Sequence, residues 1–97
     1  MKAKIGVKLI GEMPQNSIIW DTTIAGFNAR RQRGDAVPYS VIFRNREGTQ
    51  KWFKLGKHPI LTPFLARQEA VRVLRAVTLG EDPSAERKAL RNALTGG

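Results

Sequence analysis

The 97-residue sequence contains no cysteine and only one histidine, His58. The absence of cysteine excludes disulfide bonds, thiolate zinc sites and a cysteine nucleophile. With a single histidine, neither a histidine-rich metal site nor a catalytic triad is expected. The lack of cysteine and the single histidine predict a chain that carries no metal or cofactor and performs no catalysis of its own.

Long apolar runs are also missing. The apolar stretches extend over only a few residues, so no helix is expected to cross a bilayer. Residues 1–11 alternate lysine with apolar side chains, which is unlike the continuous apolar core of a secretory signal. Hydrophobic residues make up 41% of the chain and charged residues 26%, a balance that favours one folded domain with a modest core.

Acidic residues are scarce, with eight Asp and Glu against seventeen Lys and Arg and a net charge of +9. Residues 1–57 hold eleven basic and four acidic side chains, a net of +7, whereas residues 58–97 hold six and four, a net of +2. A domain this basic is expected to bind a polyanion. Nucleic acid is the first choice and an anionic membrane surface the weaker one, and the first half of the chain should meet it.

Three short runs, rich in aromatic and β-branched residues and bounded by Gly or Pro, predict an antiparallel meander. They are Phe27 to Arg33, Tyr39 to Arg44 and Lys51 to Leu55. Alternation directs one set of side chains to the core, namely Phe27, Ala29, Tyr39, Val41, Phe43, Phe53 and Leu55. The opposite face is then polar and cationic, and it carries Asn28, Arg30, Gln32, Ser40, Ile42, Arg44, Trp52 and Lys54.

The residues after the meander predict a covering helix. Thr62 suits an N-cap, Pro63 suits the first helical position, and Gly80 suits the stop. Apolar residues follow at helical spacing, with Phe64 at the start and then Ala66, Ala70, Val73, Leu74 and Val77. Asp82-Pro83 opens a second, polar helix from Ser84 to about Leu94, which is interpreted as a connector.

The expected fold is therefore α+β, with a three-stranded antiparallel sheet packed on one main helix and a short C-terminal helical connector. The domain boundaries follow as an N-terminal segment over residues 1–16, a DNA-binding domain over 17–80 and a connector over 81–97. Ser17 to Asp21 is expected to be a short extended segment leading into a turn that closes at Gly26.

The N-terminal segment permits two interpretations. Lys2, Lys4 and Lys8 alternate loosely with apolar residues, and Gly6 and Gly11 loosen the backbone. The segment is either a mobile basic arm that lies along DNA or an extra edge strand whose lysines deter aggregation. The charge asymmetry of the chain favours the arm.

The cationic sheet face is the candidate binding site. Residues 30–57 carry eight basic and two acidic side chains, whereas solvated strands usually mix both signs. Arg can bind guanine O6 and N7 in the major groove, and Asn or Gln can pair with adenine. Arg30 and Lys54 are the first choices for groove contacts, with Asn28, Gln32, Ser40 and Arg44 beside them. Lys51, Lys57 and Arg46 at strand ends are expected to clamp phosphates, and Trp52 needs a contact on this face.

Other reactive residues are expected to be structural. Tyr39 lies on the predicted core face without a catalytic partner, so a packing role is favoured. His58, in the turn before the main helix, is expected to cap or pack. Asp21 is expected to accept backbone N–H groups in the turn leading to Gly26.

An ordered set of short motifs resembles a known family. The set comprises Trp20-Asp21, Gly26-Phe27, Arg30, Tyr39-Ser40-Val41, Leu55-Gly56, Pro59, Ala66-Arg67 and Gly80-Glu81-Asp82-Pro83. Together they resemble the N-terminal arm-binding domain of prophage-type tyrosine integrases, the group that inserts genomic islands at tRNA genes. The resemblance covers roughly Ile18 to Lys88. The sequence departs from the family pattern at Arg31, where an apolar residue is usual, at Asn28, where Gly is usual, and at His58, where Tyr is common.

The resemblance implies a non-catalytic fragment of a DNA integration and recombination protein. It implies double-stranded DNA as the partner, with other integrase protomers and recombination accessory factors as further partners, in the bacterial cytoplasm at the nucleoid. It also implies that this domain holds arm-type sites while core-binding and catalytic domains act elsewhere. The alternative is a protein-interaction module that contacts another protomer or an accessory factor through the sheet. An RNA-binding sheet is disfavoured because it needs exposed aromatics on adjacent strands, and only Trp52 qualifies.

Overall fold

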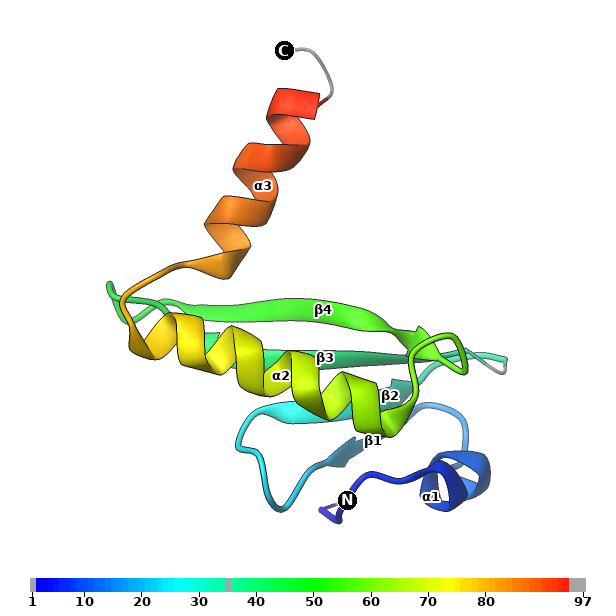
Figure 1. The fold of residues 1–97 in the computed structure, drawn as a ribbon. Coiled ribbons are helices and arrows are strands. Elements are labelled where there is room, and N and C mark those ends of the chain that lie inside the picture. Colours follow the sequence, from blue (N-terminus) through cyan, green and yellow to red (C-terminus); the bar gives the residue numbers. More distant parts are fainter. Residues whose placement is uncertain (1, 35, 95–97) are drawn as a thin grey trace.

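The computed structural model describes residues 2–34 and 36–94. The elements are α1 (Val7–Glu12), β1 (Ser17–Trp20), β2 (Phe27–Arg31), β3 (Val37–Arg44), β4 (Gln50–His58), α2 (Pro63–Thr78) and α3 (Pro83–Leu94). The strands form one antiparallel sheet in the order β1-β2-β3-β4. Helix α2 lies across one face of this sheet, and α3 leads away from it (Figure 1). Within the described ranges, every helix is too short or too polar to span a membrane.

The core lies between α2 and the sheet face that it covers. Phe27, Ala29, Tyr39, Val41, Phe43 and Phe53 are buried, and Leu55 packs against them, so the predicted core face is confirmed. Helix α2 contributes the buried residues Ala66, Ala70 and Val73, with Leu74 and Val77 partly buried. Phe64 is predicted to belong to the apolar stripe that packs on the sheet, but it is 65% exposed.

Both helices after the sheet begin where their capping residues predict. The Thr62 hydroxyl accepts a hydrogen bond from the Leu65 N–H (3.3 Å), and Pro63 is the first residue of α2. Gly80, with φ of +90°, follows the end of this helix. The Asp82 carboxylate accepts from the Ala85 N–H (3.1 Å) and so caps α3.

The prediction of three strands was wrong, because the sheet has four. The additional strand β1 coincides with the predicted extended segment, and Ile19 pairs with Ala29 of β2. Ile19 is buried toward the core, whereas Ile18 and Trp20 project from the opposite face. Because β1 carries apolar residues on both faces, its sequence does not alternate between polar and apolar residues, which is the pattern that predicts an edge strand.

The N-terminal segment differs from both a mobile arm and an edge strand. Residues 7–12 form helix α1, and Ile5, Ile10 and Met13 are buried in the core. Among residues 2–16, Lys2 alone forms a β-bridge, and its partner is Trp20. The Ala3 N–H donates to the Trp20 carbonyl (2.9 Å). The apolar residues of this segment cover the β1 end of the sheet, which buries them and fixes the segment in place.

A β-bulge changes the direction of the side chains at the end of β4. Tyr39 pairs with Gly56, and its neighbour Ser40 pairs with Lys54, so Leu55 has no partner of its own. Lys57 then pairs with Pro38, which lies on the same face of β3 as Ser40. The extra residue therefore brings Lys54 and Lys57 to one face of the sheet, the face that α2 leaves open.

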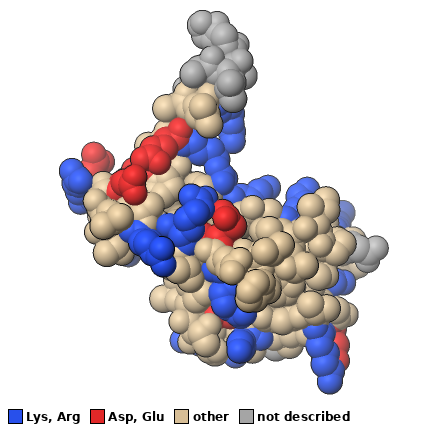
Figure 2. Space-filling model, in the orientation of Figure 1, with Lys and Arg blue, Asp and Glu red and all other residues tan. Residues whose placement is uncertain are grey.

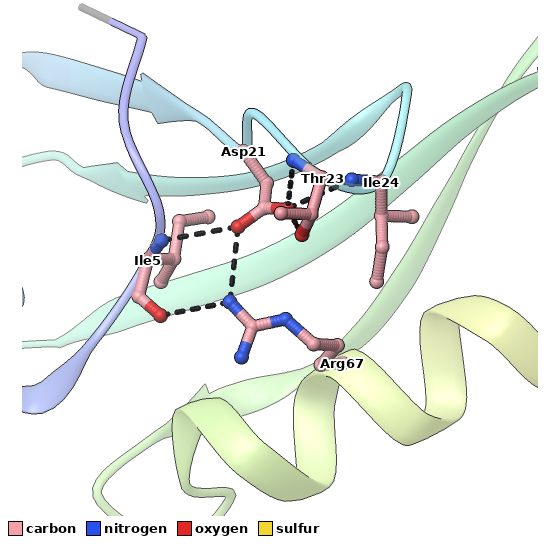
Figure 3. A network of polar contacts seen from close by, with 5 residues as sticks. All are labelled: Ile5, Asp21, Thr23, Ile24 and Arg67. Carbon is pink, nitrogen blue, oxygen red and sulfur yellow. Dashed lines mark hydrogen bonds and ion pairs between the residues drawn. The ribbon is translucent and has the colours of Figure 1, made fainter.

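A buried carboxylate joins three parts of the chain (Figure 3). One oxygen of Asp21 accepts hydrogen bonds from the Ile5 N–H and from Arg67 of α2, both at 3.0 Å. The other accepts from the backbone N–H groups of Thr23 (2.9 Å) and Ile24 (2.8 Å) and from the Thr23 hydroxyl. Burial alone would raise the pKa of Asp21, but these hydrogen bonds outweigh it and hold the pKa well below its usual range. The predicted structural role of Asp21 in this turn is confirmed.

Candidate nucleic-acid interface

We call the sheet face opposite α2 the outer face. Strand pairing places Ile18 beside Arg30, Asn28 beside Ser40, and Ser40 beside Lys54 on this face. The strands hold these side chains in register because their alternate residues fill the core below. The outer face is therefore a rigid platform whose geometry is set by the packing of the sheet against α2.

A hollow of about 490 Å³ lies on the outer face. Seven of the ten residues predicted to bind DNA line it: Asn28, Arg30, Gln32, Ser40, Trp52, Lys54 and Lys57. The other lining residues are Arg33, Ala36 and Pro38. Among the described residues that line the hollow, four side chains are cationic and none is acidic, so the hollow favours an anionic ligand.

The other three predicted residues lie near the β3–β4 turn, outside the hollow. Arg44 donates to the Gly48 carbonyl within the turn (3.1 Å). Arg46 donates through Nη2 to the Gly80 carbonyl (3.0 Å), which joins the turn to the end of α2. Lys51 pairs with Phe43, so its side chain leaves the sheet on the side of α2.

Asn28 lies on the outer face but is buried, with 1% of its surface exposed. Its Nδ2 donates to the Gly26 carbonyl (3.1 Å), while its Oδ1 has no hydrogen-bond partner among the described residues. Gly26 itself is held at φ of +86°, and a Cβ there would lie 2.4 Å from the Ile42 carbonyl oxygen. Asn28 thus supports a turn that requires glycine at position 26, and its burial leaves little of its side chain to contact DNA.

Two tryptophans from the two edge strands meet above the sheet. The ring centres of Trp20 (β1) and Trp52 (β4) are 6.2 Å apart, with an angle of 58° between the planes. The guanidinium carbon of Arg30 lies 5.6 Å from the centre of the Trp52 ring, within cation–π range. Trp52, which is expected to need a contact on this face, therefore contacts both the Trp20 ring and the Arg30 guanidinium.

The sequence patterns do not predict Trp20 and Arg33 as site residues. Ser17 to Asp21 is expected to be an extended segment outside the three-stranded sheet, so Trp20 is not placed on the outer face. Strict alternation from Phe27 places Arg33 on the core side. Strand β2 ends at Arg31, so alternation no longer applies at Arg33, and the following turn brings it to the hollow.

Arg31, a departure from the family pattern, ends β2 and points away from the hollow. Its Nη2 donates to the Ile10 carbonyl at the end of α1 (3.0 Å). Strand β2 has no bulge at this position, since Arg31 pairs regularly with Ser17. Arg31 therefore anchors the N-terminal segment to the sheet.

The single tyrosine lies in the core rather than in the hollow. Tyr39 is fully buried, and its hydroxyl is 3.0 Å from Nδ1 of His58. Burial raises the pKa of Tyr39 to about 12. A buried phenol of this kind is a poor nucleophile, and the predicted packing roles of Tyr39 and His58 are consistent with this contact.

Comparison with known proteins gives one finding. A family model described as an arm DNA-binding domain matches residues 8–90, which is most of the chain. No curated protein and no solved structure matches significantly. The matched region contains all four strands, α2 and every residue that lines the hollow.

Proposed function

Because this chain belongs to the arm DNA-binding domain family, which is found in phage integrases, we propose that its outer face holds arm-type sites in double-stranded DNA. The family supports DNA as the partner and the domain as a non-catalytic one. The finer proposal is that the domain serves a prophage-type tyrosine recombinase. Cleavage then belongs to a catalytic domain of the same protein.

The size of the sheet supports insertion into the major groove. Strands β2, β3 and β4, whose residues line most of the hollow, span about 10 Å between the outer two at the usual strand spacing. The major groove of B-DNA is about 12 Å wide and admits elements of this size. Base edges would face Arg30, Gln32 and Lys54, which line the hollow.

Arg30 is the residue that we propose to read a base. Its guanidinium carries paired N–H donors that match O6 and N7 of guanine. Contact with Trp52 restricts the side chain before DNA arrives, so less conformational entropy is lost on binding. Trp52 thus positions Arg30, and its own half-exposed ring offers an apolar surface to a thymine methyl group or a sugar.

Lys57 is proposed to hold a phosphate. It is exposed at the end of β4, where the bulge directs it to the outer face. This contact would position the sheet along the groove without reading sequence. Lys51 leaves the sheet on the side of α2, and Arg46 is bound to the Gly80 carbonyl, so neither is proposed to contact phosphates from the outer face. Asn28 is buried, so it is proposed to support the turn at Gly26 rather than to read a base.

The observation that carries this proposal is the hollow on the outer face, whose described lining residues include four cations and no acid. It is tested by the affinity of the chain for a duplex from an integrase attachment region and for a scrambled duplex. Lys54→Glu should lower the affinity for both duplexes by more than tenfold, whereas Lys88→Glu on α3 makes the same change of net charge and should have little effect. Equal losses in the two variants would mean that overall charge, not the outer face, binds DNA.

A further inference from the structure

The N-terminal half of α2 exposes more apolar surface than a helix packed only on a sheet requires. Phe64 is 65% exposed and Val71 39%, and Val7 beside them is 63% exposed. Figure 2 shows an uncharged expanse over this half of α2, with charged side chains gathered toward its C-terminal half. Exposed apolar patches of this kind mark interaction sites in folded domains.

The surface is hollowed rather than flat. One shallow hollow of about 350 Å³ lies between residues 4–7 and the start of α2. A second, of about 310 Å³, is lined by Phe64, Arg67, Gln68, Val71 and Arg75. The two hollows share the lining residues Phe64 and Arg67, so they adjoin each other along α2, and we call them together the groove. From Phe64 to Arg75 it follows about 16 Å of helix, or three turns.

The charges at the ends of the groove indicate its partner. Lys4 lines one end and Arg75 the other, and both are exposed. Arg67, between them, already pairs with Asp21 at 3.0 Å. Among the described residues, none that lines either hollow is acidic. A second copy of α2 would bring three arginines against the same surface, and its single carboxylate, Glu69, already pairs with Arg72 at 2.9 Å, so self-association is disfavoured here.

We propose that this groove, formed by Lys4, Val7, Phe64, Val71 and Arg75, docks a short amphipathic helix of another protein that carries acidic residues at both ends. Apolar residues three and four positions apart would pack on Phe64 and Val71, and the acidic ends would reach Lys4 and Arg75. The apolar lining argues against nucleic acid as the occupant, because nucleic-acid interfaces are more polar and more positively charged than protein–protein interfaces.

The groove and the DNA-binding outer face lie on opposite sides of the sheet. Helix α2 and the core separate them, so one domain can hold DNA and a protein partner together (Figure 1). The proposal does not require the outer face to bind DNA, and each surface can be tested without the other.

The test is an NMR titration of the 97-residue chain with two synthetic helical peptides of about 14 residues, four turns in length. Both carry leucines at alternating three- and four-residue spacing, and one has glutamates at its ends where the other has lysines. We expect the acidic peptide to shift the amides of residues 4–7 and 64–75, also with DNA bound. We expect the basic peptide to bind at least tenfold more weakly. Failure of the acidic peptide to bind, or equal binding of both, would overturn the proposal.

Substitutions of groove residues test whether the acidic peptide binds in the groove. Phe64→Ala and Arg75→Glu should each weaken acidic-peptide binding by roughly tenfold. Leu79→Ala, which removes another exposed apolar side chain of the same region, and Lys88→Glu should leave it unchanged. Shifts on the outer face would assign the peptide to the polyanion surface and contradict the groove. Concentration-dependent association of the chain alone, lost in Phe64→Ala, would assign the groove to a second copy.

Discussion

Arg30 of β2 and Trp52 of β4 meet across β3, with the guanidinium carbon 5.6 Å from the ring centre. The residues are far apart in sequence and lie on strands that do not pair. Their contact depends on the sheet register, which places both side chains on the outer face. Contact with the Trp52 ring restricts the Arg30 side chain, so the cationic outer face presents this arginine in a defined orientation.

Arg30→Ala should therefore affect recognition of one particular base. We expect a loss of about 1–3 kcal/mol in binding to the preferred duplex and a relaxed preference at a single base pair. Trp52→Leu should produce part of this loss, since it removes the ring but leaves Arg30 in place. Competition assays with duplexes substituted at each base pair make the measurement. Equal weakening on all duplexes would show that Arg30 contacts only the backbone.

Lys57→Ala should weaken binding to every duplex to a similar degree. A lysine that neutralises one phosphate releases about one counterion, so the slope of log affinity against log salt should become shallower by about one unit. Lys88→Ala on α3 serves as the matched control and should leave the slope unchanged. A change in base preference without a change in slope would place Lys57 at a base edge instead.

The stability of the domain should fall in acid because of Asp21. The folded pKa of Asp21 is lowered, so its contribution is fully present above the unfolded value of about 4 and is lost as the pH falls below it. Asp21→Asn should cost about 2–4 kcal/mol at neutral pH, because it leaves Arg67 without its carboxylate. Urea unfolding from pH 2.5 to 7 measures both effects. A variant as stable as the parent chain at pH 7 would refute this role of the carboxylate.

The N-terminal segment should matter for stability rather than for DNA affinity. Ile5 is 1% exposed within the core, so Ile5→Ala should destabilise the fold by about 2–4 kcal/mol. Lys8→Ala, on the exposed side of α1, should change neither stability nor DNA affinity appreciably. Thermal unfolding and duplex binding below the unfolding temperature check both. An unchanged melting temperature with a clear loss of DNA affinity would support a basic arm instead.

Much of the architecture could be predicted from local patterns. The faces of β2, β3 and β4 follow from alternation weighted by aromatic residues, and the start of α2 follows from Thr62 and Pro63. These features depend on neighbouring residues, so the sequence displays them directly. The same alternation predicts six of the candidate residues where the hollow lies, whereas Lys57 is predicted from its place at a strand end and reaches the hollow through the bulge.

The remaining features depend on contacts between distant residues. Strand β1 could not be recognised because Ile18 and Trp20 face outward, and they are tolerated there partly because Trp20 meets Trp52. Helix α1 is fixed by Ile10 in the core and by the hydrogen bond from Arg31. None of these pairings leaves a local pattern in the sequence.

Binding of arm-type DNA at the outer face is tested most directly by an NMR titration of the chain with an attachment-region duplex. We expect the largest amide shifts in residues 28–33, 38–42 and 52–57, together with a shift of the Trp52 indole N–H, since these residues surround the hollow. The amides of residues 64–75 on α2 should move little. Shifts concentrated on α2, with the Trp52 indole unmoved, would contradict the account.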